Sequence, residues 1–536
     1  MSTQITISIY LKRDKHDNGM SLKEYADAVA AGTHPILSHD EFAYQFGTVK
    51  DQMDLVIEWA TSNGLTVISS NAATATIKVS GTKEQFNSLF GITLKTAKTD
   101  DGYDYQTYDG TITFPTDIDD IVQMVLGFDT KPIMKKRAIM FDPTTANLSV
   151  NPRAYPIAQA VTPVQVANAY NVPAGDGYGG CLGILGFTNQ EYVIGYNTTD
   201  INASFNRIGL TPPTIIDVLV NGATRSNTSD GESMLDIYCA GAVVPRAKIV
   251  MYTAPNSGQG FYDAIMATST DTTNMPSSVG ISWGANEQAP PVGDYLSAAF
   301  QACVAVGITC FSASGDYGAE NLVPDYPSTN AYQISCGGTT LYLNNGQWEV
   351  EEAWTTTGGT PGTGAGGGGI SNHVARPSWQ NGITYTTITA GGLGTPTVLP
   401  RRGYPDICAP GDPTTGYQFY VNNVLSQYGG TSAAAPFLAG MFCRLTQLWG
   451  RRSTFANALF YANTQAFTDI TVGNNRNNET TGYSTTVGWD ACTGLGSPKG
   501  NEIYKLFHTG STYPKLNYGF RPTSGAVYPR KTSGVR

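Results

Sequence analysis

Residues 429–449 constrain the fold and the chemistry of this chain more than any other segment. They begin with the string GGTSAAAP and continue as a nearly unbroken apolar run, which predicts a buried helix from Ala433 to Trp449. The two glycines permit a tight turn before the helix, so Ser432 is expected at its N-terminus. Free N–H groups and the positive end of the helix dipole would face an oxyanion that forms there. Ser432 is therefore a candidate nucleophile.

A nucleophilic serine needs a base, and histidine is nearly absent from the chain. Between residues 40 and 507 the only histidine is His373, in a glycine-rich loop. The string GESMLDI offers carboxylates instead, because Glu232 and Asp236 are four residues apart and share one face of a predicted buried helix. Two like charges are costly there unless they share a proton or a partner. Acids that merely complement a helix N-terminus are the alternative interpretation.

From residue 154 onward, apolar strands alternate with helical stretches. This alternation predicts an α/β fold in which a parallel sheet carries helices on both faces. The predicted strands are 182–187, 215–220, 248–253, 279–283, 308–313 and 333–336.

The two ends of the chain follow other patterns. Residues 1–130 alternate short strands and helices as a compact α+β domain does, with capping boxes at 38–41 and 82–85 opening two helices. Residues 131–153 lack periodicity and are expected to form a linker. Residues 509–536 are basic and aromatic without a pattern, and a disordered appendage is expected there, with a tether or sorting segment as the alternative.

Composition excludes some functions. The net charge is −10, the pI is about 5.0 and only 14% of residues are charged, which argues against nucleic-acid binding. No apolar run approaches the roughly 18 residues of a membrane span. The first residues, MSTQITISIYLKRDKHDNG, lack the apolar region of a signal peptide. The eight cysteines lie mostly in apolar strings, which favours buried free thiols and leaves disulfides open.

Five strings follow one another along the chain in this order: GESMLDI, AGAVVPRAKIVMYTAP, SVGISWG, SASGDYGA and GGTSAAAP. In this order they resemble the sedolisin (serine-carboxyl peptidase) family, and its kumamolisin-type members most. The resemblance runs from about residue 20 to about residue 507. It implies a subtilisin-like α/β catalytic domain over 154–508, preceded by a small α+β, ferredoxin-like prodomain over 1–130 that inhibits and assists folding. The linker 131–153 would be the activation segment.

The resemblance also implies roles for the catalytic residues. Ser432 would be the nucleophile, Glu232 its general base, Asp236 the group that holds and polarises Glu232, and Asp316 a member of the oxyanion hole. The chemistry agrees, because a carboxylate with an ordinary pKa of about 4.3 is a useful base only in acid. Asp316 can donate to an oxyanion only when protonated, which again favours acid conditions.

Substrate contacts follow from the same resemblance. The edge formed by Ser282, Trp283 and Gly284 would pair with an extended substrate, as in recognition by added β-strands. Asp325 would add negative charge to a specificity pocket, with a turn aspartate as the equal alternative.

One structural calcium ion is also implied. The carboxylates of Asp469 and Asp490 and the carbonyls of Ile470, Thr486 and Gly488 suit a hard cation that takes six or more oxygens. Relatives often have glycine at the position of Thr486, a change that a carbonyl ligand survives if the backbone conformation does.

Together these features predict an acid-active serine endopeptidase made as a self-processing zymogen. Its partners would be protein or peptide substrates and its own prodomain in cis, with no nucleic acid and no membrane span, and a monomer is expected. The resemblance suggests an extracellular or acidic compartment. Two alternatives stay open: a catalytically retired relative that binds or packages other molecules, and an esterase that uses the same serine.

Overall fold

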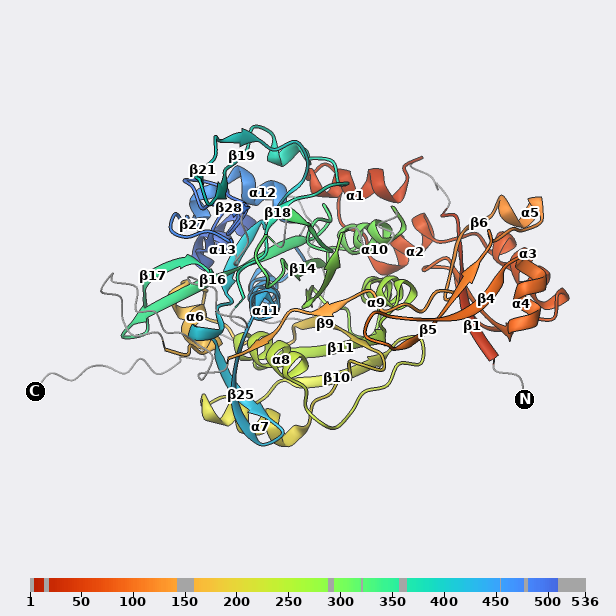
Figure 1. Cartoon of the computed structure of the whole chain (residues 1–536), viewed down its shortest axis with the longest axis horizontal. Coiled ribbons are helices and arrows are strands. Elements are labelled where there is room, and N and C mark those ends of the chain that lie inside the picture. The colour runs from red at the N-terminus through yellow and green to blue at the C-terminus, as the bar shows by residue number, and fades with distance from the viewer. Residues whose placement is uncertain are drawn as a thin grey trace, which may run out of the picture.

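The computed structural model has two unequal parts, a small N-terminal domain and a larger body (Figure 1). It describes residues 4–13, 19–141, 159–287, 294–319, 322–355, 364–453, 455–476 and 481–509. Residues 142–153 of the predicted linker and 510–536 of the predicted tail lie outside these ranges. Within them, no helix combines the length and the apolar character that crossing a bilayer requires.

The small domain is an antiparallel sheet with two helices, in strand order β2-β3-β1-β6. Its elements are β1 (Gln4–Leu11), α3 (Lys50–Ser62), β2 (Thr66–Asn71), β3 (Thr76–Thr82), α4 (Lys83–Phe90) and β6 (Val122–Leu126). This β-α-β-β-α-β order with β1 and β3 in the centre is the expected ferredoxin-like arrangement. The predicted capping box at Thr82 and Gln85 opens α4.

Two helices between β1 and α3 leave the small domain and pack on the larger body. They are α1 (Leu22–Ala30) and α2 (His39–Phe46), and α2 opens with the predicted capping box of Ser38 and Glu41. Their apolar side chains, among them Tyr25 and Phe42, share one buried cluster with Phe300 of the larger body. The sheet of the small domain has a separate core.

The larger body is built on an eight-stranded sheet in which most strands are parallel. Its strands, in spatial order, are β10 (Thr214–Leu219), β11 (Lys248–Pro255), β9 (Cys181–Thr188), β12 (Ser278–Ile281), β14 (Thr309–Ala313), β16 (Ile334–Asn344) and β17 (Gln347–Ala353), with β24 (Ile407–Pro410) also paired to β16. All six predicted strands are confirmed. The predicted strand 279–283 differs in one respect, because it divides at Ser282 into β12 and β13 (Trp283–Asn286).

Helices cover both faces of this sheet, as predicted. One face carries α8 (Gly231–Val243) and α11 (Thr431–Trp449), and the other carries α9 (Gly258–Thr270) and α10 (Asp294–Ala305). Further helices are α6 (Pro163–Ala169), α7 (Thr198–Arg207), α12 (Asn457–Ala462) and α13 (Gly500–Thr509). All eight cysteines are buried and none forms a disulfide, which agrees with the favoured prediction.

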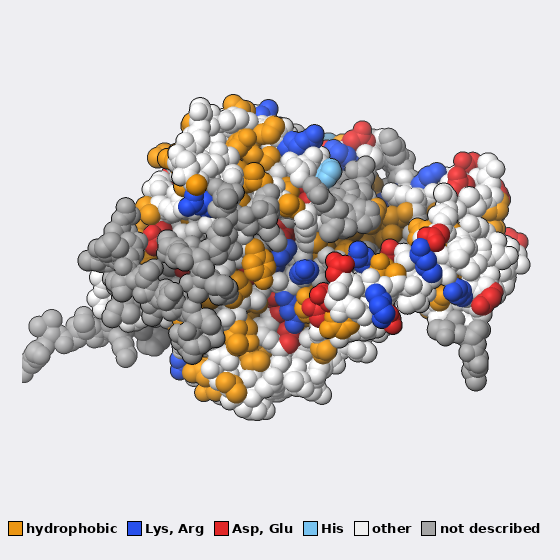
Figure 2. Space-filling model, in the orientation of Figure 1, with side chains coloured by type: hydrophobic (Ala, Val, Ile, Leu, Met, Phe, Trp, Pro, Cys, Tyr) orange, Lys and Arg blue, Asp and Glu red, His pale blue; other side chains and the backbone are white. Residues whose placement is uncertain are grey.

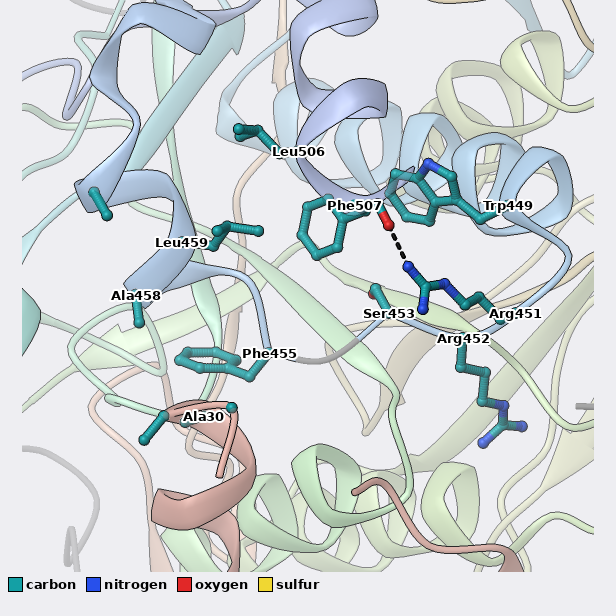
Figure 3. Close-up of a pocket in the computed structure, with 13 residues that line it drawn as sticks. Ala30, Trp449, Arg451, Arg452, Ser453, Phe455, Ala458, Leu459, Leu506 and Phe507 are labelled. Atoms are coloured by element: carbon teal, nitrogen blue, oxygen red, sulfur yellow. Dashed lines mark hydrogen bonds between the residues drawn. The ribbon is translucent and has the colours of Figure 1, made fainter. Parts of the chain in front are cut away.

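A cavity of about 310 Å³ lies where the end of α1 meets the C-terminal helices (Figure 3). Its lining is largely apolar and includes Ala30, Trp449, Phe455 and Phe507. None of the predicted catalytic, substrate-binding or calcium residues lines it, so it is a packing gap between the two parts of the molecule.

Candidate active site

Ser432 lies in the first turn of α11, as predicted, and is fully buried. Gly430 precedes the helix with φ +110°, and a side chain there would meet the carbonyl oxygen of Arg137 and Oδ2 of Asp316. Only glycine therefore fits this turn. Ser432 Oγ donates to the carbonyl oxygen of Ser282 at 3.2 Å.

Glu232 and Asp236 both face this serine region from α8 and are buried. Glu232 Oε2 accepts a hydrogen bond from the backbone N–H of Arg137 at 3.0 Å. Asp236 Oδ1 accepts one from Ser282 Oγ at 2.5 Å. Ser282 thus contacts Asp236 through its side chain and Ser432 through its backbone, and it connects these two residues of the predicted triad.

Burial sets the protonation of this carboxyl pair. It raises the pKa of Glu232 to about 8, with the Ser432 hydroxyl and then Lys136 acting in the opposite direction. The pKa of Asp236 is raised well above its ordinary value by burial and then by the charge of Glu232. Ionising both carboxyls of this buried pair at once is therefore unfavourable.

Asp316 follows β14 and is also buried. Its Oδ1 accepts hydrogen bonds from the backbone N–H and the hydroxyl of Thr431, both at 2.7 Å. Its Oδ2 has no hydrogen-bond partner within the described ranges. This oxygen and the Arg137 carbonyl oxygen both border the space that a side chain at Gly430 would fill. Burial raises the pKa of Asp316 to about 7, and the bonds from Thr431 lower it less.

The linker crosses this site in an extended conformation. On one side β7 (Lys135–Lys136) pairs antiparallel with β13, and on the other β8 (Ile139–Met140) pairs with β26 (Val424–Gly429). Between them, the carbonyl oxygen of Arg137 accepts from the Ser432 N–H at 3.1 Å. The predicted binding edge of Ser282, Trp283 and Gly284 is therefore the edge that holds the chain's own linker.

Asp325 lies in the two-residue strand β15 (Asp325–Tyr326) beside β13 and is buried. Its carboxylate pairs with the guanidinium of Arg137. Sequence reasoning left Asp325 open and did not assign Arg137, Lys136 or Asp230 to the site. The signal was present as the basic run KKR in the linker, but its partners come from distant segments.

The predicted calcium residues lie around one surface loop. Asp490 is fully buried, and its Oδ2 accepts from the Thr486 N–H at 3.2 Å. Asp469 is exposed and accepts from the Gly488 N–H at 2.8 Å, while the neighbouring Ile470 is buried. Within the described ranges no three His, Cys, Asp or Glu side chains gather as for a metal, so a cation here would depend on backbone oxygens.

Comparisons with known proteins agree with this geometry. Residues 1–131 match the pro-kumamolisin activation domain and residues 186–489 match the subtilase family. Kumamolisin from Bacillus sp. (strain MN-32) is 34% identical over 518 residues, which cover 93% of this chain and 90% of that protein. Sedolisin from Pseudomonas sp. (strain 101) is 30% identical over 289 residues, covering 50% of this chain and 47% of that protein.

A solved structure supports the fold. Pseudomonas sedolisin (serine-carboxyl proteinase), complexed with two molecules of pseudo-iodotyrostatin, superposes with a TM-score of 0.56 at 24% identity, covering 65% of this chain and 98% of that chain. Sequence similarity along nearly the whole chain, the activation domain and the subtilisin-like sheet lead to one conclusion. The chain belongs to the kumamolisin-type sedolisins, serine-carboxyl peptidases that carry an activation prodomain.

Proposed function

We propose that this peptidase is an acid-active endopeptidase that processes itself, with Ser432, Glu232 and Asp236 as its triad and Asp316 in the oxyanion hole. One observation carries the proposal. A peptide of the chain's own linker lies on Ser432 with its carbonyl oxygen at the Ser432 N–H, beside Oδ2 of Asp316. A peptide in this position favours peptide hydrolysis over an esterase, and the intact catalytic set argues against a retired relative.

The proposed reaction is acyl transfer to the serine. Ser432 Oγ attacks the carbonyl carbon and gives its proton to Glu232, whose Oε1 is not engaged by the linker. The Ser432 N–H and a protonated Asp316 stabilise the oxyanion. Glu232 then passes the proton to the leaving nitrogen, and water hydrolyses the acyl-enzyme by the same steps in reverse. Asp236, bonded to Ser282, keeps Glu232 in place.

The active form carries a proton on Asp316 and none on Glu232. In the closed chain burial raises both pKa values, to about 7 and about 8. The bound linker can therefore be cut only in the small fraction of molecules in which Glu232 has lost its proton while Asp316 keeps one. When the linker leaves, water reaches Glu232, its pKa falls toward the ordinary value of about 4.3, and that fraction rises. Asp316 still loses its proton as the pH rises, so activity belongs to the acid range.

The first test is substitution of the nucleophile and the base. Ser432→Ala and Glu232→Gln should each lower turnover of a peptide substrate by about 10⁴-fold or more. Both side chains are buried, so circular dichroism and melting temperature must show that the variants remain folded. Full activity in a folded Ser432→Ala protein would end the serine-peptidase proposal.

A structural calcium ion is also part of the proposal. The carboxylates of Asp469 and Asp490 and the carbonyls of Ile470, Thr486 and Gly488 would hold it, and it would supply charge and cross-link the loop. The residues fit a hard cation, because all of them would offer oxygens and, among the described residues, the buried Asp490 carboxylate is engaged only by N–H and O–H donors of Thr486, Cys492 and Thr493.

Chelation tests this site through stability. A cation that binds only the folded chain stabilises it by mass action, so a chelator should lower the melting temperature of the wild type. It should hardly shift that of Asp469→Ala, and added calcium should restore only the wild type. An identical change of melting temperature in both proteins would contradict the proposed calcium site.

A further inference from the structure

We propose that the hairpin of β25 (Tyr417–Val421) and β26 holds the base and the nucleophile in place relative to each other, with Tyr428 and Asn422 as positioning residues. This inference rests on the proposed function and adds to it two residues that act on the reaction through Glu232. The observations that carry it are three contacts between the hairpin and the segment that runs into α8.

The hairpin is continuous with the segment that carries the nucleophile. Its strands pair antiparallel from Tyr417 and Tyr428 to the turn, and β25 packs against α7 and α8 (Figure 1). β26 ends at Gly429, and α11 begins two residues later at Thr431, with Ser432 in its first turn. A displacement of the hairpin would therefore move Ser432 as well.

The first contact ties the turn of the hairpin to the loop that precedes α8. Asn422 and Asn423 form the turn with φ of +52° and +64°, as a tight two-residue hairpin requires. Asn422 Nδ2 donates to the Ser229 carbonyl oxygen at 2.9 Å, and the Ser229 N–H donates to Asn422 Oδ1 at 3.1 Å. Ser229 is buried and lies next to Asp230, the N-cap of α8, so these bonds fix the start of the helix that carries Glu232.

A buried carboxylate holds the turn itself. Asp200 of α7 is fully buried and accepts from the backbone N–H groups of Asn422 at 2.7 Å and Asn423 at 2.9 Å. It also accepts from Asn197 Nδ2 at 2.8 Å, and the same amide donates to Ser229 Oγ at 2.9 Å. The turn therefore cannot shift without breaking bonds to a buried charge, which is costly.

The second and third contacts are made by aromatic rings of the two strands. Tyr428 lies against Gly231, the first residue of α8, where a side chain would come within 2.4 Å of a ring carbon and 2.7 Å of the hydroxyl oxygen. Phe419 stacks on Tyr428 with ring centroids 5.2 Å apart, and its other neighbour is Tyr238 of α8, whose ring centroid is 5.6 Å away. The rings thus hold α8 on both sides of Glu232.

This arrangement connects the two reacting groups by a route of its own. α8 also packs on α11 in the core, whereas the hairpin joins the first residues of both helices. Proton transfer from Ser432 to Glu232 depends on how the two groups are placed, and a displacement of about 1 Å can cost about 100-fold in rate. The hairpin side chains therefore act on the chemical step rather than on substrate binding.

The first experiment compares variants of the processed enzyme in acid with one peptide substrate. Tyr428→Ala should lower kcat about 100-fold, and Asn422→Gly, which keeps the positive φ of the turn, about 10-fold, each with KM within about two-fold of the wild type. Tyr428→Phe keeps the ring and should restore kcat. Asn423→Gly is the matched control, because the bond of Asn423 to Asp200 comes from its backbone. Melting temperatures show whether each variant is folded.

A double-mutant cycle separates positioning from a general loss of structure. In the Glu232→Gln background the base is gone, so Tyr428→Ala should lower the residual rate by less than about two-fold. These proteins are matured with tagged wild-type enzyme, which is then removed by its tag. A full 100-fold effect in this background would show that the ring supports the fold at large, and it would overturn the inference.

The outcomes separate this inference from the proposed function. A raised KM with unchanged kcat in Tyr428→Ala would make the ring a substrate contact, and wild-type kcat in both Tyr428→Ala and Asn422→Gly would leave the hairpin without a role. Either result would overturn the inference, while hydrolysis that depends on Ser432 would continue. Full activity in a folded Ser432→Ala protein would overturn the proposed function instead.

Discussion

Asp316 uses its two carboxyl oxygens differently, and this division sets a pH dependence. Oδ1 is committed to the two Thr431 donors, whereas Oδ2 borders the carbonyl oxygen of the bound linker. A carboxyl donates to an oxyanion only with its proton, and its pKa is raised to about 7 by burial. The donor is therefore present below about pH 7 and is lost as the pH rises through that value.

An amide at this position should remove the pH dependence. In Asp316→Asn the oxygen can still accept from Thr431 while the NH₂ group replaces the protonated Oδ2. We expect wild-type kcat/KM to fall as the pH rises and Asp316 loses its proton, and the Asn variant to show a lower rate in acid without that fall. Asp316→Ala should lose about 10²- to 10³-fold at acid pH. If kcat/KM of Asp316→Asn falls with rising pH as in the wild type, a group other than Asp316 causes the fall.

The sequence indicated which four candidate catalytic residues would lie together better than it indicated the groups around the linker. Ser432, Glu232, Asp236 and Asp316 lie in short local strings of recognisable pattern, and the structure places all four in one buried region. The pairing of Arg137 with Asp325 could not be predicted, because it joins a linker to a strand 188 residues away and depends on the packed fold.

At the level of elements, the contact between α8 and α11 brings the proposed base and the proposed nucleophile together. Ala240 and Gly440 meet where the two helices cross, and a side chain at Gly440 would lie 2.8 Å from the Ala240 carbonyl oxygen. On its other side α11 rests on β12, where Gly280 lies under Pro436. The alternating apolar pattern predicted these elements correctly, but it gave no sign that β12 would end at Ser282, where a side chain turns to Asp236.

This close crossing should not tolerate even one methyl group. Gly440→Ala should lower the melting temperature and the rate together, because the added carbon pushes α11 away from α8. Gly258→Ala in α9 is the matched control, since its added carbon would meet only the Tyr295 hydroxyl at 3.6 Å. A Gly440→Ala protein as stable and active as the control would show that the helices can separate without cost.

At the scale of the whole molecule, charged groups hold the closed form both at the domain interface and in the active site. Asp263 of the larger body accepts from the Tyr10 hydroxyl at 2.7 Å and lies 3.6 Å from Lys78 Nζ, both in the small domain. Neutralising Asp263 by substitution would remove the attraction to Lys78. Glu232, whose pKa is raised to about 8, stabilises the closed form below its unfolded pKa and loses this effect as the pH rises through 8.

On the face shown in Figure 2, the acidic and basic side chains of the described residues are interspersed rather than gathered by sign, so the field on this face depends on local pairs.

A weaker domain interface should favour activation. Asp263→Asn removes the attraction to Lys78, so at one fixed acid pH a larger fraction of this variant than of the wild type should be cleaved after a fixed time. Asp54→Asn, which removes an exposed ion pair within the small domain, should leave that fraction unchanged. Ser432→Ala should stay intact unless active enzyme is added. A wild-type time course in Asp263→Asn would show that this ion pair does not hold the two domains together.

The linker is tethered on both sides of Ser432, so before the cut it competes with every other peptide at the effective concentration of a covalently attached ligand, which is about millimolar for short tethers. The cut ends this advantage without changing a single contact. The prodomain then occupies the cleft as an ordinary product, and its occupancy depends on how much protein surrounds it. Inhibition therefore depends on protein concentration after the cut, which it does not before it. A concentrated sample of freshly cut enzyme should remain inhibited, and dilution alone should make it active.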